Sequence, residues 1–390
     1  MEYRRFGKLD WKVSALGFGC MRFPRNRQGE IEVAETEQLL GYAIEHGVNY
    51  LDTSHEYEGT EEVLGNLLSR GYRDRVKIAT KLLPWRVDSA ADFDAMLEKQ
   101  LVLLQTDHID LYMLHALNCR RWPHVRDLGI LQWLEKQLAA GRIRGTGFSF
   151  HDEYKVFQEI VDSFDWTVCQ IQYNFRDIQY QAGEKGLRYA ASRGMAVAVM
   201  SPLRGGQLVD PPRQIREIWK QAPQKRSPAD WALQWLWSQP EVSVVLSGMS
   251  AMDQLAENIT SAEASGVGKL SSAEQSLCER AGSVYRGLHP VPCTGCGYCM
   301  PCPHGVNIPR NFYRFNEGKV HGGKTLELAR RDYDQGELRP NAAHAGACTQ
   351  CRECESKCPQ EIPISEWMPK VDAVLGEGRS YAEVLRQGAG

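Results

Sequence analysis

The cysteines of this 390-residue sequence constrain its fold more than any other feature. Eight of the 12 cysteines lie in two short runs, Cys293-x2-Cys296-x2-Cys299-x2-Cys302-Pro303 and Cys348-x2-Cys351-x2-Cys354-x3-Cys358-Pro359. The sequence begins without the apolar core of a secretory signal, so we expect a reducing, cytoplasmic setting in which disulfides are rare. The clustered cysteines are therefore predicted to bind metal.

The spacing of the two runs favours iron–sulfur clusters over zinc. Three thiolates spaced two residues apart surround one cubane, and a fourth cysteine followed by proline reaches a second one. The second run resembles the bacterial ferredoxin pattern at every position, and the first is one residue shorter before its last cysteine. A pair of Cys₄ zinc sites would need two C-x2-C pairs each, which does not explain triplets that end in Cys-Pro.

The expected wiring of two [4Fe–4S] clusters is crossed between the runs. One cluster would be held by Cys293, Cys296, Cys299 and Cys358, and the other by Cys348, Cys351, Cys354 and Cys302. The four scattered cysteines (Cys20, Cys119, Cys169 and Cys278) are expected to be small buried apolar residues, with Cys20 set apart by its place at a strand end.

The first 275 residues alternate between short β-rich runs and longer amphipathic stretches. Eight runs are predicted strands: 15–19, 48–52, 76–80, 109–114, 143–148, 168–172, 195–200 and 242–246. Eight βα units in about 250 residues favour a closed (β/α)₈ barrel, although an open doubly wound sheet shares this periodicity. The lack of a G-x-G-x-x-G turn after a strand weakens that alternative.

The predicted organisation is a barrel over 1–275, a helical linker over 276–292, a small α+β ferredoxin-like iron–sulfur domain over 293–370 and a tail over 371–390. Predicted helices include 91–104, 131–140, 271–285, 309–316 and 325–332.

Charge and hydropathy exclude two classes of partner. The formal net charge is -3 and no long basic block occurs, so nucleic acid is not an expected partner. No apolar run approaches the roughly 20 residues of a membrane helix, so we expect a soluble protein without membrane insertion.

Four polar residues are expected at one mouth of the barrel, because the C-terminal ends of its strands meet there. They are Asp52, Tyr57, Lys81 and His115. Singly, each has an ordinary structural explanation, but together they form a proton-transfer site. A tyrosine hydroxyl has a pKa near 10 and donates a proton usefully only beside a cation, which Lys81 can supply with Asp52 as its partner. His115 can orient a substrate carbonyl.

The segment 47–57, with Thr80-Lys81 and Leu114-His115, resembles the tetrad of the aldo-keto reductase family. The resemblance covers about residues 1 to 275. It implies that Tyr57 is the general acid, that Lys81 and Asp52 tune it, and that His115 orients the carbonyl of a small-molecule substrate. It also implies that NADP or NAD, in its reduced form, carries the hydride.

The same resemblance implies contacts with the nicotinamide cofactor. They are Cys20, Met21, Asp52, Ser149, Gln170, Met200, Ser201, Leu203, Arg204, Gly205, Gly248, Ser250, Gln254, Glu257 and Asn258. Two positions depart from the family: Phe150 stands where many members have Asn, and Met200 where many have a stacked tyrosine. The adenosine loop lacks the usual Lys and Arg, so the preference between NADH and NADPH stays open.

The whole chain resembles the branch of this family that carries a C-terminal ferredoxin-like domain. Nicotinamide delivers two electrons and a [4Fe–4S] cluster exchanges one, which leaves three interpretations. The clusters exchange electrons with an external redox protein or an unusual substrate; they are structural or sensory; or the barrel binds nucleotide without catalysis. The complete tetrad argues against the last. Phe23, Trp85 and Met200 either line an apolar substrate pocket or belong to the core.

Overall fold

The structure is a computed structural model that describes residues 1–334 and 344–386. Its internal contacts divide it into two compact units. The first unit comprises Met1–Leu203 and Arg226–Cys278, and the second comprises Arg204–Lys225 and Glu279–Gly390. The division expected from the sequence was contiguous, whereas the structure groups Arg204–Lys225 with the cysteine-rich part of the chain.

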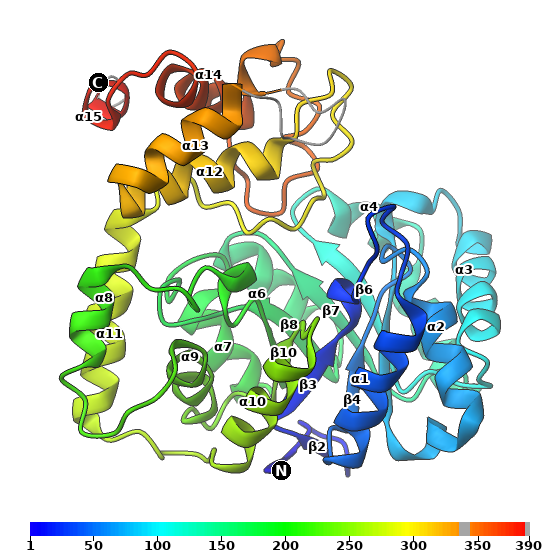
Figure 1. Ribbon diagram of the computed structural model, residues 1–390. Coiled ribbons are helices and arrows are strands. Elements are labelled where there is room, and N and C mark those ends of the chain that lie inside the picture. The colour runs from blue at the N-terminus through cyan, green and yellow to red at the C-terminus, as the bar shows by residue number, and fades with distance from the viewer. Residues whose placement is uncertain (335–343, 387–390) are drawn as a thin grey trace. The chain divides into compact units, whose positions relative to one another are not determined.

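The first unit is the predicted closed barrel of eight parallel strands (Figure 1). The strands are β3 (Leu16–Gly19), β4 (Tyr50–Asp52), β5 (Lys77–Leu82), β6 (Leu111–Leu117), β7 (Thr146–Phe150), β8 (Val168–Gln172), β9 (Ala196–Met200) and β10 (Val244–Ser247). Each pairs with the next in chain order, and β10 pairs with β3 to close the barrel. All eight predicted runs overlap a strand, because buried parallel strands are short apolar runs.

The helices of the barrel lie outside its strands (Figure 1). They are α1 (Val33–Glu45), α2 (Thr60–Leu67), α3 (Ala90–Leu103), α4 (Arg121–Asp127), α5 (Ile130–Ala139), α6 (Tyr154–Asp162), α7 (Gly183–Ser192), α9 (Pro228–Trp237) and α10 (Met252–Glu263). Local signals fix their ends. A capping box formed by Ser89 and Asp92 starts α3, and Gly141, with φ of +71°, follows α5.

A hairpin that the sequence analysis did not predict closes the N-terminal end of the barrel. It pairs β1 (Tyr3–Arg5) with β2 (Lys12–Ser14) in antiparallel fashion. Phe6 and Val13 are fully buried in one cluster with Tyr50 and Val244, each of which lies at the N-terminal end of a barrel strand. The opposite, C-terminal end of the strands carries the polar residues of the candidate site.

The second unit is helical and differs from the α+β domain predicted for it. Its helices are α8 (Arg213–Trp219), the later part of α11 (Ser272–Leu288), α12 (Ile308–His321), α13 (Gly323–Asp334), α14 (Ile364–Leu375) and α15 (Tyr381–Arg386). Within residues 279–334 and 344–386 no strand forms, because the two cysteine runs are irregular and turn-rich. Gly295, Gly297 and Gly305 all adopt positive φ there.

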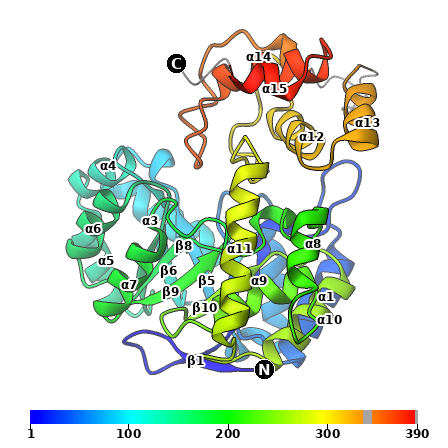
Figure 2. The ribbon, with the colours of Figure 1, turned by 90° about the vertical axis from the view of Figure 1, so that its left-hand side faces the viewer.

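The core of the second unit joins these helices to the cysteines. α12 packs against α13 and α14, and α14 packs against α15 (Figure 2). The core contains Phe312 and Phe315 of α12, Val371 of α14 and Val384 of α15, with Cys299 and Cys354 beside them. The predicted tail, 371–390, therefore belongs to this core as far as Leu385; residues 387–390 lie outside the described residues.

No helix in the described residues is both long enough and apolar enough to cross a membrane.

We predict that Phe6→Ala destabilises the barrel unit. Phe6 is fully buried against the ring of Tyr50, with the two ring centroids 5.6 Å apart. Loss of such a side chain typically costs about 3 kcal/mol or more of unfolding free energy. Urea unfolding of the full chain measures the loss, with Val102→Ala as the control because Val102 is 73% exposed. Equal stability of the two variants would show that the packing of Phe6 from the hairpin does not stabilise the barrel.

Candidate functional site

The structure brings the four predicted polar residues together at the C-terminal end of the barrel. Asp52 is the last residue of β4, and Lys81 lies near the end of β5. The register between these strands pairs Asp52 with Ala79, so Lys81 lies two residues beyond Asp52's partner on the same side of β5. His115 lies within β6, at an irregularity of its pairing with β7.

Lys81 is the centre of this group. Its side chain is completely buried, and its Nζ donates to Asp52 Oδ1 and to the carbonyl oxygen of Thr53, both at 2.8 Å. Burial raises the pKa of the Asp52 carboxyl, and the Lys81 ammonium opposes part of that rise. The same ammonium lies 5.5 Å from the ring centroid of Tyr57. A fixed cation therefore lies beside the tyrosine ring.

Tyr57 lies in the loop after β4, in a turn where its N–H donates to the carbonyl oxygen of Ser54 at 2.9 Å. Its ring meets the ring of His115 edge to face, with the centroids 5.9 Å apart and the planes at 89°. Trp85 also contacts His115, with ring centroids 5.3 Å apart and the planes at 46°. The tyrosine, the histidine and the lysine therefore form one contiguous cluster.

Ser54 orients His115, and the sequence analysis did not single it out. Ser54 Oγ lies 2.9 Å from His115 Nδ1 and accepts from the N–H of Glu56 at 3.2 Å. The Ser54 hydroxyl therefore contacts both the His115 ring and the main chain of the loop after β4. Burial, followed by the charge of Lys81, holds the pKa of His115 well below its ordinary value. His115 is therefore neutral.

The residues expected around the nicotinamide lie on β7, β8 and β9. Ser149 pairs with Gln170 in the β7–β8 register, and Ser149 Oγ accepts from the N–H of Ala116 at 2.7 Å. Gln170 Nε2 donates to Met200 Sδ at 3.7 Å. Gln170 Oε1 is buried and has no hydrogen-bond partner within the described part of the chain. A carboxamide NH₂ would supply the missing donor, so these residues fit a nicotinamide ring.

Hydrogen bonds between its own residues hold the expected adenosine loop, and the side chain of Arg22, which follows β3, lies against it. Ser250 N–H donates to Gln254 Oε1 at 3.1 Å, and Asn258 Nδ2 donates to Ser247 Oγ at 3.1 Å. The side chain of Arg22 lies against Gly248, so close that a Cβ there would come within 3.2 Å of it. Sequence reasoning missed Arg22, which is more than 200 residues away along the chain; the signal was its place just after Cys20-Met21.

The structure shows less about the remaining residues that were predicted to contact the cofactor or the substrate. Glu257 lies on α10, Leu203 ends the first stretch of the first unit, and the short 3₁₀ turn Arg204–Gly206 begins the second unit. Burial raises the pKa of the Cys20 thiol well above its usual range, so Cys20 is a neutral thiol. Phe23 is buried against Phe18, with ring centroids 6.1 Å apart, and belongs to the core, whereas Trp85 is 37% exposed beside His115.

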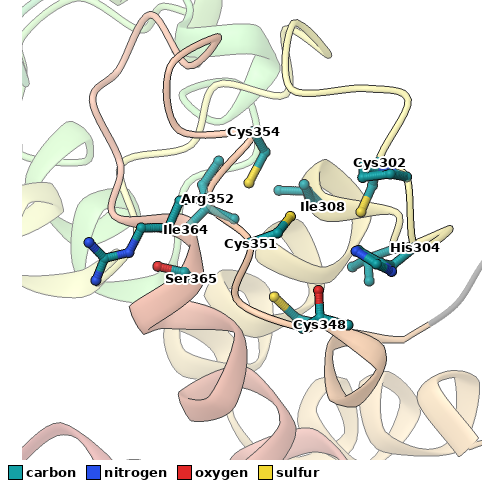
Figure 3. Close-up of a pocket in the computed structure, with 12 residues that line it drawn as sticks. Cys302, His304, Ile308, Cys348, Cys351, Arg352, Cys354, Ile364 and Ser365 are labelled. Atoms are coloured by element: carbon teal, nitrogen blue, oxygen red, sulfur yellow. The ribbon is translucent and has the colours of Figure 1, made fainter.

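The eight clustered cysteines line two pockets of the second unit, and the grouping crosses the two runs. One pocket is lined by Cys293, Cys296, Cys299 and Cys358. The other is lined by Cys302, Cys348, Cys351 and Cys354, whose sulfurs face a common space (Figure 3). Ile308 and Ile364 line both pockets and separate the two groups of thiols.

The chemistry of both pockets fits iron–sulfur clusters. Burial raises the pKa of Cys293 and of Cys354 to about 11, so four thiolates in such a place need a cationic centre to compensate their charge. In the described residues, no three His, Cys, Asp or Glu side chains lie close enough to hold a single metal ion.

Comparisons with known proteins agree with both the barrel and the cysteine-rich unit. The sequence model of the aldo/keto reductase family matches residues 15–274, and that of a 4Fe-4S dicluster domain matches residues 292–364. The uncharacterized oxidoreductase YqkF of Bacillus subtilis (strain 168) is 26% identical over 68% of this chain and 92% of its own length.

Two solved structures resemble the barrel. The holo form of aldo-keto reductase AKR11C1 from Bacillus halodurans has a TM-score of 0.62 and 26% identity, covering 72% of this chain and 96% of that one. An aldo/keto reductase from Klebsiella pneumoniae, in complex with NADP and acetate, has a TM-score of 0.59 and 26% identity, covering 71% of this chain and 94% of that one.

The crossed grouping of the cysteines leads to a prediction about iron content. With two [4Fe–4S] clusters, the wild type holds about eight irons per chain, and a cluster that loses one ligand is lost, leaving about four. Cys358→Ala and Cys296→Ala should remove the same cluster, so their double variant keeps about four irons. The double variant of Cys358→Ala with Cys351→Ala should keep almost none. Iron and sulfide analysis of anaerobically prepared protein measures this.

The reverse pattern would contradict crossed wiring. If Cys358 served the same cluster as Cys351, their double variant would keep about four irons, and the double variant with Cys296 would lose both clusters.

Proposed function

This chain belongs to the aldo/keto reductase family, and we propose that it reduces the carbonyl group of an aldehyde or ketone with a bound NADPH or NADH, using Tyr57 as the general acid. One observation carries the proposal: at the C-terminal end of the barrel strands, buried Lys81, paired with Asp52 at 2.8 Å, lies beside the ring of Tyr57, which in turn meets the ring of His115. A barrel that only bound nucleotide would have no need of this acid.

When bound, the reduced nicotinamide supplies the hydride, and thus both electrons, for the new C–H bond at the carbonyl carbon. The buried Gln170 Oε1 and the Ser149 hydroxyl support a carboxamide at this place. Arg22 beside Gly248 offers a cation to a nucleotide phosphate, and the Klebsiella pneumoniae relative binds NADP. These residues would hold the ring and the phosphates on one side of the mouth.

Tyr57 gives its hydroxyl proton to the carbonyl oxygen as the C=O double bond becomes a C–O single bond, which produces the alcohol. The phenolate that remains on Tyr57 is stabilised by the Lys81 ammonium. Asp52 and the Thr53 carbonyl fix that ammonium, so the charge does not need to be reorganised during the reaction. Solvent returns the proton to Tyr57 after product release.

His115 orients the carbonyl in this proposal. In the tautomer that this role requires, with its proton on Nε2, the neutral imidazole donates one hydrogen bond to the substrate oxygen and does not compete with Tyr57 as the proton donor. Ser54 is a positioning residue because it acts through His115. Trp85, exposed at the mouth beside His115, offers an apolar face to the rest of the substrate.

The second unit admits two functions. A [4Fe–4S] cluster exchanges one electron, which suits exchange with an external electron-transfer protein. The alternative is a structural or sensory module that docks a partner, and it is favoured by the place of the cysteines within the small core of that unit. Replacing Cys354 with Ala separates them: aldehyde reduction that continues undiminished in folded protein supports the structural or sensory role, and its loss supports electron exchange.

We predict that Tyr57→Phe lowers kcat/KM for aldehyde reduction by about 10² to 10⁴, the usual contribution of a general acid. The ring and its packing on His115 remain, so nucleotide binding should be unchanged. Turnover is measured under anaerobic conditions with a panel of aromatic and aliphatic aldehydes and ketones, with NADPH and NADH in turn.

The matched control is Tyr3→Phe, a hydroxyl removed at the opposite end of the barrel, where Tyr3 donates to the carbonyl oxygen of Gly47. It should leave turnover unchanged. Wild-type protein that reduces no carbonyl compound with either nucleotide would overturn the proposed function, and an active Tyr57→Phe variant would overturn the role of Tyr57.

A further inference from the structure

Glu61 is a buried ionisable residue that has no part in the proposed reaction. It is the second residue of α2, and it is only 3% exposed. A buried polar group is costly unless it is hydrogen-bonded, and a buried ion pair adds little stability over apolar residues of similar volume. Packing alone therefore does not explain a glutamate at this place in the barrel wall, and its partners indicate what it does.

One oxygen of Glu61 holds the strand that carries Lys81. Glu61 Oε1 accepts from Thr80 Oγ1 at 2.6 Å and from Gln100 Nε2 at 2.8 Å. Thr80 directly precedes Lys81 in β5, and the two side chains lie on opposite faces of the strand because successive residues alternate. Gln100 Nε2 also donates to the carbonyl oxygen of Lys81 at 3.2 Å. Glu61 thus holds β5 at the residue before Lys81 and, through Gln100, at Lys81 itself.

The other oxygen of Glu61 holds the loop that carries Tyr57. Glu61 Oε2 lies 2.7 Å from His55 Nδ1, and the His55 side chain is only 12% exposed. His55 comes two residues before Tyr57 in the loop after β4. Thr60, the residue before Glu61, binds the same loop, because its N–H and its Oγ1 donate to the carbonyl oxygen of Tyr57 at 3.0 and 2.7 Å. The start of α2 therefore holds this loop at two points.

The partners of Glu61 within the barrel wall are themselves fixed. Thr80 and Gln100 are completely buried, and Gln100 Oε1 accepts from the hydroxyl of Tyr112 at 2.7 Å. Tyr112 is the register partner of Thr80 on β6, and it is completely buried as well. A buried network whose members are hydrogen-bonded is rigid. Glu61 therefore joins the loop to a fixed part of the barrel.

The place of Tyr57 relative to Lys81 matters for the proposed reaction. The Lys81 ammonium lies 5.5 Å from the ring centroid of Tyr57, and its stabilisation of a phenolate depends on the distance between the two charges. Displacement of a catalytic group by about 1 Å can slow a reaction by about 10²-fold. Because Lys81 lies in a strand and Tyr57 in a loop, a contact that joins the loop to the strand preserves their geometry.

We propose that Glu61 is a positioning residue: by holding His55 with one oxygen and Thr80 with the other, it sets the place of the Tyr57 hydroxyl relative to the Lys81 ammonium. This rests on the proposed function, because it requires Tyr57 to act as the acid. Glu61 neither gives a proton to the substrate nor takes one from it. It acts only through the two residues that it holds.

The test breaks each contact with Glu61 by a variant of similar size and pairs that variant with a conservative one. Thr80→Val removes the hydroxyl that binds Oε1, and Thr80→Ser keeps it. His55→Phe removes Nδ1 and keeps an aromatic ring, whereas His55→Asn keeps a nitrogen close to the place of Nδ1. The measurement is the rate of a single turnover of aldehyde reduction by full-length protein loaded with NADPH or NADH. Single turnover separates the chemical step from product release, and it counts only protein that binds nucleotide.

We expect Thr80→Val and His55→Phe each to lower the single-turnover rate by about tenfold or more, with unchanged nucleotide affinity. Thr80→Ser and His55→Asn should keep most of the wild-type rate. The double variant of Thr80→Val with His55→Phe should be little slower than the slower single variant, because one broken contact already separates the loop from the strand.

Asp94→Asn is the matched control. Asp94 is a half-buried carboxylate of α3, the helix that also carries Gln100, and its Oδ1 accepts from Trp133 Nε1 at 2.9 Å and from Gln137 Nε2 at 3.2 Å on α5. Its loss removes a carboxylate that joins two helices and leaves the contacts of Glu61 in place. The single-turnover rate of Asp94→Asn should therefore equal that of the wild type.

The outcomes separate this inference from the function on which it rests. Wild-type rates in both Thr80→Val and His55→Phe would overturn the positioning role and leave the proposed function intact. A double variant whose loss equals the product of the two single losses would overturn the single bridge through Glu61. A wild type that binds nucleotide and reduces no carbonyl compound would overturn the proposed function and this inference together. If one of the two variants folds poorly, the other still decides, because each contact is required on its own.

Discussion

The buried pair of Lys81 and Asp52 is the interaction on which the rest of the barrel site depends. An ammonium and a carboxylate inside a protein are tolerated only when they satisfy each other, and removing one partner of such a pair costs about 3 to 5 kcal/mol. The register between β4 and β5 brings the two side chains together at 2.8 Å. The cation that this pair fixes then determines which neighbours can act as acid, since Tyr57 and His115 both lie within its field.

Buried charge is also the constraint in the second unit, where the ionisable groups are cysteine thiols. Two groups of four cysteines line two pockets, with Ile308 and Ile364 in the lining of both, in a unit whose core is otherwise built from apolar side chains of short helices and loops. Neutral thiols tolerate that burial, but thiolates do not without a cationic centre. The predicted clusters would thus supply both the charge that the pockets require and much of the packing that holds the helices together.

The elements that sequence could predict are those with a local signal. Buried parallel strands read as short apolar runs, so all eight were found, and the spacing of Cys348 to Cys358 indicated its chemistry without any structure. The three-residue strands of the hairpin show no periodicity. Ser54 and Arg22 gain their importance from partners far along the chain, His115 and Gly248. The membership of Arg204–Lys225 in the second unit is likewise a property of long-range contacts alone.

In the function proposed for this chain, the barrel delivers two electrons to the carbonyl carbon together, as hydride. The most direct measurement is reduction of an aldehyde with a nicotinamide that carries deuterium at the reactive C4 position, with the product alcohol analysed by nuclear magnetic resonance. We expect one deuterium on the carbinol carbon, transferred to one face, and no hydrogen acquired there from solvent. A carbinol hydrogen that came from water would contradict hydride transfer, because the electrons would then have reached the carbon separately from the hydrogen.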